Sequence, residues 1–161
     1  MRPRLPQLAT LLLLSRPMLQ AQASPQCQVV PKSFAAMHGC FRPLLVFSPT
    51  PNNALLRHQI ALLDRDADDM MDRFVLYTPI TSDPHRLGTP LDAPYTILDA
   101  QQRSEIRAHF HVPESEFAVL LLDEDGSVML RSTNPVNPAR LNALIDRTPE
   151  RQAEMVRAHA N

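Results

Sequence analysis

Two cysteines, Cys27 and Cys40, are the only thiols in this chain of 161 residues, and their spacing limits the chemistry they can perform. Twelve residues separate them. Closing a loop of that size adds roughly 3 kcal/mol of stability in the chain-entropy model. In an oxidising compartment, two such cysteines usually pair. We therefore predict a structural disulfide that ties the N-terminal segment to the start of the first predicted strand. A redox-active pair is the alternative interpretation.

A second place for chemistry is the turn at residues 48–53, between an apolar run at 44–47 and an amphipathic helical pattern. A strand that turns into a helix in this way often presents a reactive cysteine, because the helix dipole lowers the pKa of a thiol at the N-terminus. This turn reads Ser-Pro-Thr-Pro-Asn-Asn and contains no cysteine. Hydroxyl and amide side chains cannot shuttle electrons, and the sequence offers no His–Asp pair to activate a hydroxyl here.

The same turn is a candidate binding site. We expect Thr50 to cap the helix, followed by a proline at the first helical position. The first turn of a helix carries free backbone N–H groups and the positive end of the dipole, which attract anions. With Asn52 and Asn53, and with Arg42 or Arg131 nearby, this helix end could hold a small anion or a peptide carboxylate. The plainer interpretation is that Thr50 caps the helix and does nothing more.

Histidines and carboxylates give little indication of a metal site. His109 and His111 lie two residues apart and can bind a metal from an extended segment, but the remaining histidines have no spacing that completes a site. Acidic residues crowd positions 64–72 at helical spacing, which cannot wrap an ion as a loop does. The acidic turn at 123–126 continues into no calcium loop. We interpret these residues as solvent-exposed and expect no metal and no cofactor.

The N-terminus has the pattern of a signal peptide. Arg2 and Arg4 precede an apolar run at 8–14 that is too short to span a bilayer, and an Ala-Gln-Ala triplet then fits a small-x-small cleavage site. We predict a signal peptide over residues 1–23 and cleavage before Ser24. The mature protein would be exported, periplasmic or extracellular, with no stable membrane anchor after cleavage.

The mature chain would be acidic. Removal of Arg2, Arg4 and Arg16 leaves 13 basic residues against 17 acidic ones, a formal charge of −4. A polyanion is an unfavourable partner for such a surface, and the sequence has no basic stripe. We therefore expect no nucleic acid among its partners.

Hydrophobic periodicity and capping residues place four strands and four helices in the chain. The predicted strands cover residues 44–47, 74–80, 117–122 and 127–132. The predicted helices cover residues 50–72, 99–110, 137–145 and 148–159, with Asp99 and Asn137 as N-caps of the second and third. In the second strand, pairing is expected to stop at Pro79, because proline cannot donate to the ladder. Gly126 supplies the positive φ of a hairpin between the last two strands.

This order of elements predicts the fold. The first strand–helix–strand crossover requires a parallel pair, and the hairpin requires an antiparallel one. Four strands of mixed direction with helices on both faces form an α/β, thioredoxin-like arrangement. We expect an irregular lead-in over residues 24–41, with one helical turn near 33–38, and a single domain over 42–161.

Three segments carry a resemblance to a known family: RPLLVFSP (42–49), FAVLLLDEDGSVMLRS (117–132) and LIDRTPERQAEM (144–155). In this order they resemble a thioredoxin-like domain of unknown function found in exported bacterial proteins. Related domains, described as peroxiredoxin-like, occur in animal sushi-repeat-containing proteins and in a steroid-sensitive extracellular-matrix protein. The resemblance covers residues 42–157. It implies a thioredoxin-like fold, an exported location and no established reaction.

The chain departs from the active relatives at both halves of their redox site. Thioredoxins place a Cys-x-x-Cys where the first strand turns into the helix, which falls here at residues 50–55 and contains no cysteine. In peroxiredoxins a proline leads to a Thr and then to the peroxidatic Cys. Pro49 matches that proline, but the positions that follow, Asn53 and Leu56, carry neither the Thr nor the peroxidatic Cys. The position of the thioredoxin cis-proline is occupied by Ala118.

These departures rank the functional hypotheses. The leading one is a non-catalytic binding or interaction module for a protein, a peptide or a small anion. In thioredoxin-like folds the loop that corresponds to residues 114–118 forms a groove for extended peptides, which supports this hypothesis by analogy. The second is an oxidoreductase of peroxiredoxin-like descent that uses Cys27 and Cys40. The third is metal handling through His109 and His111.

Overall fold

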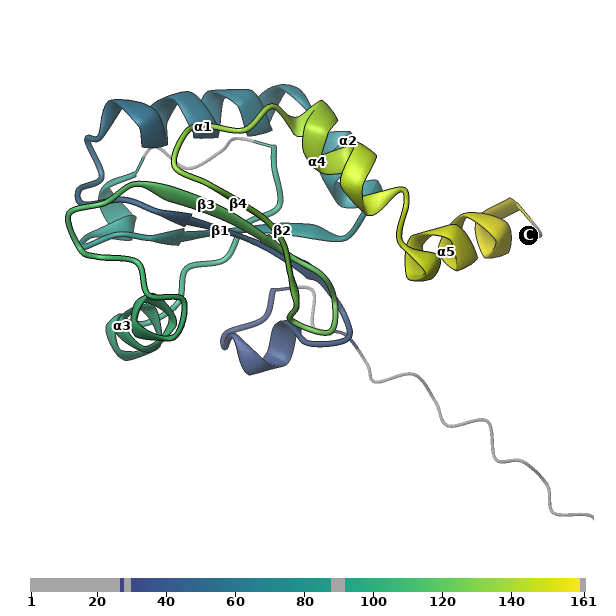
Figure 1. The fold of residues 1–161 in the computed structure, drawn as a ribbon, viewed down its shortest axis with the longest axis horizontal. Helices are drawn as coiled ribbons and strands as arrows, with labels where there is room; N and C mark the ends of the chain where they lie inside the picture. Colours follow the sequence, from purple (N-terminus) through teal and green to yellow (C-terminus); the bar gives the residue numbers. More distant parts are fainter. Residues whose placement is uncertain (1–26, 28–29, 88–91, 160–161) are drawn as a thin grey trace, which may run out of the picture.

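The computed structural model describes residues 27, 30–87 and 92–159, so the predicted signal peptide lies outside the described residues. Four strands form one sheet in the order β2-β1-β3-β4 (Figure 1). Its strands are β1 (Arg42–Phe47), β2 (Val75–Ile80), β3 (Ala118–Leu122) and β4 (Val128–Ser132). β1 pairs with β2 in parallel, whereas the β1–β3 and β3–β4 pairs are antiparallel. The mixed directions predicted from the sequence are confirmed.

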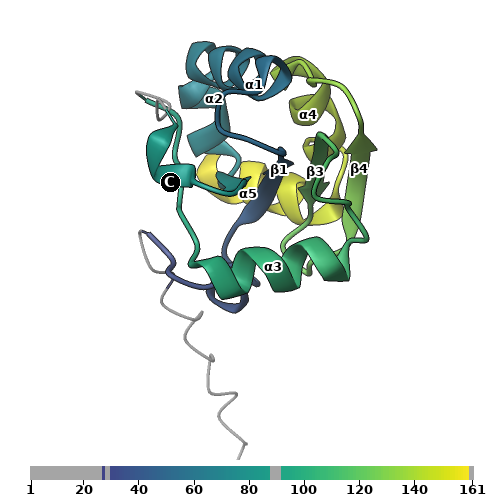
Figure 2. The same ribbon diagram turned by 90° about the vertical axis from the view of Figure 1, so that its left-hand side faces the viewer.

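Helices cover both faces of this sheet (Figures 1 and 2). One face carries α1 (Ala54–Arg65), α2 (Ala67–Asp72) and α4 (Pro138–Ile145), and the other carries α3 (Ala100–His109) and the short 3₁₀ helix η1 (Ala35–Met37). A second 3₁₀ helix, η2 (Pro84–Arg86), follows β2, and α5 (Pro149–His159) follows α4 at the end of the sheet where β1 begins. In the described part of the chain, no helix has the length and apolar character needed to cross a bilayer.

The alternation of side chains along β1 divides the core into two layers. Leu44 and Val46 pack with α1, α2 and α4, whereas Leu45 and Phe47 pack with α3 and η1. All six residues of β1 are buried, which explains why its apolar run has no polar alternation. The strand is therefore held on both faces, and the turn that follows it is placed rigidly at one end of the sheet.

Two local predictions are wrong. The predicted helix over 50–72 is two helices, because Asp66 leaves the helical region with φ −122° and ψ 30° between α1 and α2. Pairing also continues through Pro79, which lies opposite Val46. β2 is an edge strand, and the N–H of Tyr77, two residues earlier, already points outward, to Pro94 O at 2.9 Å. The N–H that Pro79 lacks would point the same way, so the ladder with β1 loses no hydrogen bond.

The lead-in to the domain is tied down by covalent and polar contacts. Cys27 and Cys40 form a disulfide with their Cα atoms 5.6 Å apart. Thr96 Oγ1 donates to Pro31 O at 2.7 Å, and Gln102 Oε1 accepts from the N–H of Phe34 at 3.0 Å. The single helical turn expected near 33–38 is η1.

Candidate functional site

The turn after β1 caps its helix three residues later than we predict from the sequence. Asn53, not Thr50, is the N-cap of α1: its Oδ1 accepts from the N–H groups of Leu55 (2.9 Å) and Leu56 (3.4 Å). Thr50 instead closes the turn, where its carbonyl accepts from the N–H of Asn53 and from Ser48 Oγ. Asparagine is among the strongest N-cap residues, so the later of the two candidates prevails. Two N–H groups of the helix end are thereby occupied.

Neither arginine of the predicted anion site reaches this helix end, although Asn52 is exposed beside it. Arg42 is the first residue of β1, whereas the turn follows the last one. Arg131 lies on β4 opposite Leu120, which belongs to the core layer beneath α3, and it donates to Phe110 O at 2.8 Å. The length of β1 therefore separates Arg42 from the α1 N-terminus. Arg131 is separated from it because it lies on the other face of the sheet.

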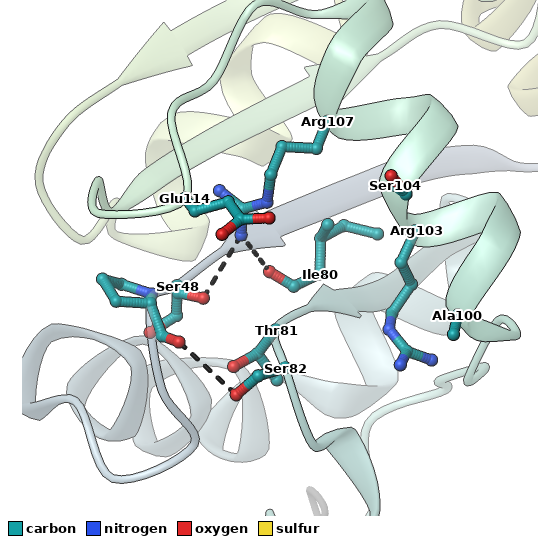
Figure 3. Close-up of a pocket in the computed structure, with 10 residues that line it drawn as sticks. Ser48, Ile80, Thr81, Ser82, Ala100, Arg103, Ser104, Arg107 and Glu114 are labelled. Carbon is teal, nitrogen blue, oxygen red and sulfur yellow. Dashed lines mark hydrogen bonds between the residues drawn. The ribbon is translucent and has the colours of Figure 1, made fainter.

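A pocket of about 240 Å³ opens next to the turn, on the α3 side of the sheet (Figure 3). The ends of β1 and β2, the inner side of α3 and the loop before β3 all contribute to it. Its lining consists of Ser48, Pro49, Ile80, Thr81, Ser82, Ala100, Arg103, Ser104, Arg107 and Glu114. Of the loop predicted to form a peptide groove, only Glu114 lines the pocket.

Arg107 joins the elements that surround this pocket. Its Nη2 donates to Ile80 O (2.9 Å) and Ser48 O (3.3 Å), which are the carbonyls at the ends of the two parallel strands. Its Nη1 donates to Pro113 O at 2.7 Å, and its guanidinium lies 5.4 Å from the centre of the Phe47 ring. Burial lowers the pKa of Arg107, and the nearby Glu114 carboxylate opposes this shift. Among the described residues no carboxylate forms an ion pair with it.

Two further side chains of the pocket, Thr81 and Arg103, have polar atoms without a partner among the described residues. Thr81 is 4% exposed, and its Oγ1 has no hydrogen-bond partner in the described part of the chain. Arg103 donates through Nη1 to Leu98 O, and no bond from its Nε or Nη2 is formed with the described residues. Arg103 and Arg107 are four residues apart on α3, which places both on one side of the helix. That spacing is visible in the sequence, but the side of α3 that meets the strand ends is set only by the fold.

A second polar site, at the opposite end of β1, holds a buried arginine. The side chain of Arg42 is 0% exposed. Its Nη2 lies 2.8 Å from Glu154 Oε1 and 3.1 Å from Glu124 Oε1, and its Nε lies 3.3 Å from Asp123 Oδ1. Its Nη1 donates to Arg73 O at 2.9 Å. One cation therefore faces three carboxylates, which we call the Arg42 cluster.

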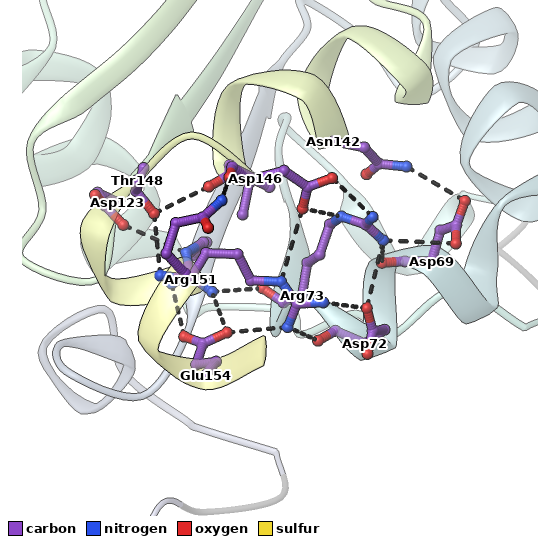
Figure 4. A network of polar contacts seen from close by, with 12 residues as sticks. Asp69, Asp72, Arg73, Asp123, Asn142, Asp146, Thr148, Arg151 and Glu154 are labelled. Carbon is purple, nitrogen blue, oxygen red and sulfur yellow. Dashed lines mark hydrogen bonds and ion pairs between the residues drawn. The ribbon is translucent and has the colours of Figure 1, made fainter. Parts of the chain in front are cut away.

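Arg151 continues this cluster toward α2 (Figure 4). It donates to Asp72 O at 2.8 Å and to Glu154 Oε2 at 3.1 Å, and it forms an ion pair with the Asp72 carboxylate. Next to it, Arg73 makes a two-point contact with Asp146, with Nε–Oδ1 2.9 Å and Nη2–Oδ2 3.0 Å. The arginine and carboxylate side chains thus connect α5 to β1, α2 and the end of α4.

The cluster perturbs its carboxyl groups in opposite directions. Burial raises the pKa of Glu124, and the neighbouring Glu154 and Asp123 charges raise it further against the attraction of Arg42. Burial also acts to raise the pKa of Glu154, but hydrogen bonds from Arg42 and Arg151 outweigh it and lower that pKa. Of Glu124 and Glu154, Glu124 therefore protonates first on acidification.

The Arg42 cluster also brings together the three segments that carry the family resemblance. The first supplies Arg42, the second supplies Asp123 and Glu124, and the third supplies Arg151 and Glu154. No spacing within one segment predicts this contact, since Arg42 and Glu154 are 112 residues apart. The motifs therefore mark a structural centre of the domain, away from the strand-to-helix turn.

The cysteines and histidines form no site at the turn. The Cys27–Cys40 disulfide precedes β1, and a strand of six residues, about 20 Å long, separates it from Ser48. His109 packs edge-on against the Phe110 ring with 4.7 Å between the ring centres. In the part of the chain that the structure describes, no three His, Cys, Asp or Glu side chains gather in a group that could hold a metal ion.

Comparison with known proteins places this fold. The family described as a domain of unknown function, DUF4174, matches residues 33–154. No curated protein matches the chain. Among solved structures, Plasmodium yoelii thioredoxin peroxidase I is 21% identical with a TM-score of 0.53, covering 70% of this chain and 75% of its own.

Two other peroxiredoxins are similar to the same extent. The reduced 2-Cys peroxiredoxin of Plasmodium vivax is 21% identical with a TM-score of 0.54, covering 70% of this chain and 80% of its own. The mitochondrial 2-Cys peroxiredoxin of Plasmodium falciparum is 16% identical with a TM-score of 0.51, covering 70% and 78%. At these identities the likeness concerns the fold alone. The chain belongs to the DUF4174 family of domains of unknown function, and its fold is the thioredoxin-like fold of the peroxiredoxins.

Proposed function

We propose that this domain is an exported, non-catalytic binding module built on a peroxiredoxin-like scaffold. One observation carries the proposal. At the turn where the scaffold presents its reactive thiol, the chain has Asn53 as a helix cap and no cysteine. Thiol chemistry needs a thiolate at that helix end, where the dipole stabilises its charge. The Asn53 side chain accepts hydrogen bonds from N–H groups, but it cannot transfer electrons.

The hydroxyl groups of the turn do not replace the thiol. Ser48 is buried, and its Oγ donates to Thr50 O at 2.9 Å, which holds it in the turn. A nucleophilic serine needs a base within hydrogen-bond reach. Among the described residues, no histidine forms a hydrogen bond with Ser48, whose Oγ donates to Thr50 O. These contacts favour a structural role for the turn.

Export is supported by the N-terminal signal pattern and by the disulfide, since paired cysteines are typical of oxidising compartments. The resemblance to domains of exported proteins points the same way. A protein, a peptide or a small anion is the proposed partner, and the pocket beside the turn is the proposed place of contact. No metal and no cofactor take part in this function.

Peroxide consumption tests the proposal. The chain from Ser24 is assayed with hydrogen peroxide and a dithiol reductant, next to a peroxiredoxin as the positive control. We expect the same background rate for the wild type and for the Cys27→Ser/Cys40→Ser variant. The alternative, an oxidoreductase using this pair, draws on the solvent exposure of Cys27. Turnover that disappears in Cys40→Ser would establish that alternative.

A further inference from the structure

We infer that the pocket between Arg103, Arg107 and Thr81 binds a carboxylate group. The inference rests on the proposed function, because it names the ligand chemistry of that binding module. It differs from the anion site predicted at the α1 N-terminus, where Asn53 occupies two of the N–H groups and neither Arg42 nor Arg131 arrives. The pocket lies on the other side of the turn, against α3.

Charge favours an anion in this pocket. Arg103 and Arg107 bring two positive charges to its wall, and Glu114 brings one negative charge. Glu114 is exposed and makes no ion pair with either arginine among the described residues. The wall therefore keeps one net positive charge, which matches a singly charged group. Partial burial of Arg107 reduces the screening of its charge by water.

Thr81 provides the polar group that needs a ligand. Its Oγ1 is buried and unpartnered, although a buried hydroxyl without a hydrogen bond costs free energy. Ser82 Oγ and Ser48 Oγ beside it are already occupied, by Pro49 O and Thr50 O. An acceptor oxygen placed in the pocket would satisfy Thr81 and recover that cost.

Arg103 provides the geometry that selects a carboxylate. Its Nη1 is held by Leu98 O, which leaves the edge formed by Nε and Nη2 without a partner among the described residues. Two parallel N–H groups at such an edge match the two oxygens of a carboxylate. Arg107 lacks this freedom, because both of its terminal nitrogens already donate to backbone carbonyls. Arg103 therefore contacts the ligand, and Arg107 contributes charge and holds the pocket walls together.

A volume of about 240 Å³ admits a small group only. Two sources have this chemistry: a free short-chain carboxylic acid, and the C-terminal carboxylate of a peptide whose remaining residues lie outside the pocket. The experiment separates them with four probes, namely propionate, propionamide, N-acetyl-trialanine with a free carboxylate, and the same peptide as its amide. Each is titrated into the ¹⁵N-labelled chain from Ser24, and the amide signals of Thr81, Ser82 and Ser104 are followed by NMR.

We expect saturable shifts of these signals with a carboxylate and none with the matching amide. Thr81→Val should weaken binding about tenfold, the effect of losing one hydrogen bond of about 1.4 kcal/mol. Arg103→Gln should weaken binding more than tenfold, because it removes a two-point contact and its charge. Arg57→Gln is the control, since Arg57 is an exposed arginine on α1 outside the pocket. Thr81→Val should also fold at least as stably as the wild type, because it removes an unpartnered buried hydroxyl.

Binding of propionate alone identifies a free acid as the source, and binding of the peptide acid alone identifies a chain terminus; either result supports the inference. Equal binding of acids and amides, or binding that survives both pocket substitutions, overturns it. A folded protein that binds no carboxylate and consumes no peroxide overturns the inference and leaves the non-catalytic proposal intact. Cysteine-dependent peroxide turnover overturns the non-catalytic proposal instead.

Discussion

At the scale of single residues, Gln59 on α1 shows how one buried amide can replace a piece of secondary structure. It is 0% exposed, and its Oε1 accepts from the N–H of Val136 at 2.7 Å while its Nε2 donates to Val136 O at 3.1 Å. Both polar backbone groups of a buried residue are thereby satisfied by one side chain. The segment that leads from β4 to α4 is held against α1 by this pair of bonds.

Replacing Gln59 with Leu should therefore be costly even though the new side chain is apolar and similar in size. The N–H and C=O groups of Val136 would remain buried without partners, which we expect to lower the free energy of unfolding by roughly 2–4 kcal/mol. Urea unfolding measures the change. His58→Leu, at the exposed neighbouring position, should alter stability by less than about 0.5 kcal/mol. Equal effects of the two substitutions would contradict this role for Gln59.

Local signals of this kind are partly visible in a sequence. Asp99 and Asn137 are predicted as caps and are confirmed, since Asp99 accepts from the N–H of Gln102 at 2.8 Å and Asn137 from that of Ala139 at 2.9 Å. At α1 the prediction fails, because Thr50 and Asn53 are both good caps and the choice depends on how the turn leaves β1. Gln59 gives no signal at all, since its partner is 77 residues away.

At the scale of elements, α5 is attached to the domain mainly through charged side chains. Among the side chains of α5 that the structure describes, Arg151 is the buried one, and Glu154 reaches Arg42 at the start of β1. The apolar Val156 is 70% exposed. A helix held by ion pairs depends on their geometry more than one held by apolar packing, because each buried charge must keep its partner.

Arg42→Met should detach this helix and destabilise the domain. The substitution leaves Asp123, Glu124 and Glu154 together without their central cation, and breaking a buried pair in this way costs about 3–5 kcal/mol. We expect lower stability in urea and faster amide hydrogen exchange throughout α5. The matched control is Arg65→Met, at an exposed position at the end of α1. A loss below about 1 kcal/mol would show that the cluster behaves as a surface ion pair does.

At the scale of the whole molecule, the hydrophobic periodicity of the sequence predicts the fold but does not predict the sites. The β1 run, the hairpin at Gly126 (φ 85°) and the crossover fix the order of elements and hence the mixed sheet. The Arg42 cluster is different, because it joins residues from segments separated by most of the chain. The pocket of Arg103 and Thr81 likewise depends on which side of α3 meets the ends of β1 and β2. Local patterns determine elements, whereas long-range packing determines sites.

The cluster also makes the stability of the whole domain depend on pH in a way that distinguishes its carboxyl groups. The pKa of Glu124 is raised in the folded state above its ordinary value of 4.5, by burial and then by the charges of Glu154 and Asp123. Folding therefore favours the protonated form. The stability that Glu124 contributes is fully present below its ordinary pKa and is lost as the pH rises through the raised one. The lowered pKa of Glu154 has the opposite consequence: its contribution is present above 4.5 and is lost as the pH falls.

Glu124→Gln and Glu154→Gln should consequently move thermal stability in opposite directions at neutral pH. Glu124→Gln removes a charge that the folded state disfavours, so this variant should melt above the wild type at about pH 7, with the difference disappearing toward about pH 4. Glu154→Gln removes a charge that Arg42 and Arg151 stabilise, so it should melt below the wild type at about pH 7. The difference in melting temperature between Glu154→Gln and the wild type should also shrink on acidification, because the wild-type carboxylate is then protonated. Melting curves recorded by circular dichroism across this pH range measure both differences. A shift of the melting temperature in the same direction for both variants at neutral pH would contradict this assignment. It would mean that Glu124 is as well paired as Glu154, so that Arg42 stabilises the charges of all three carboxylates.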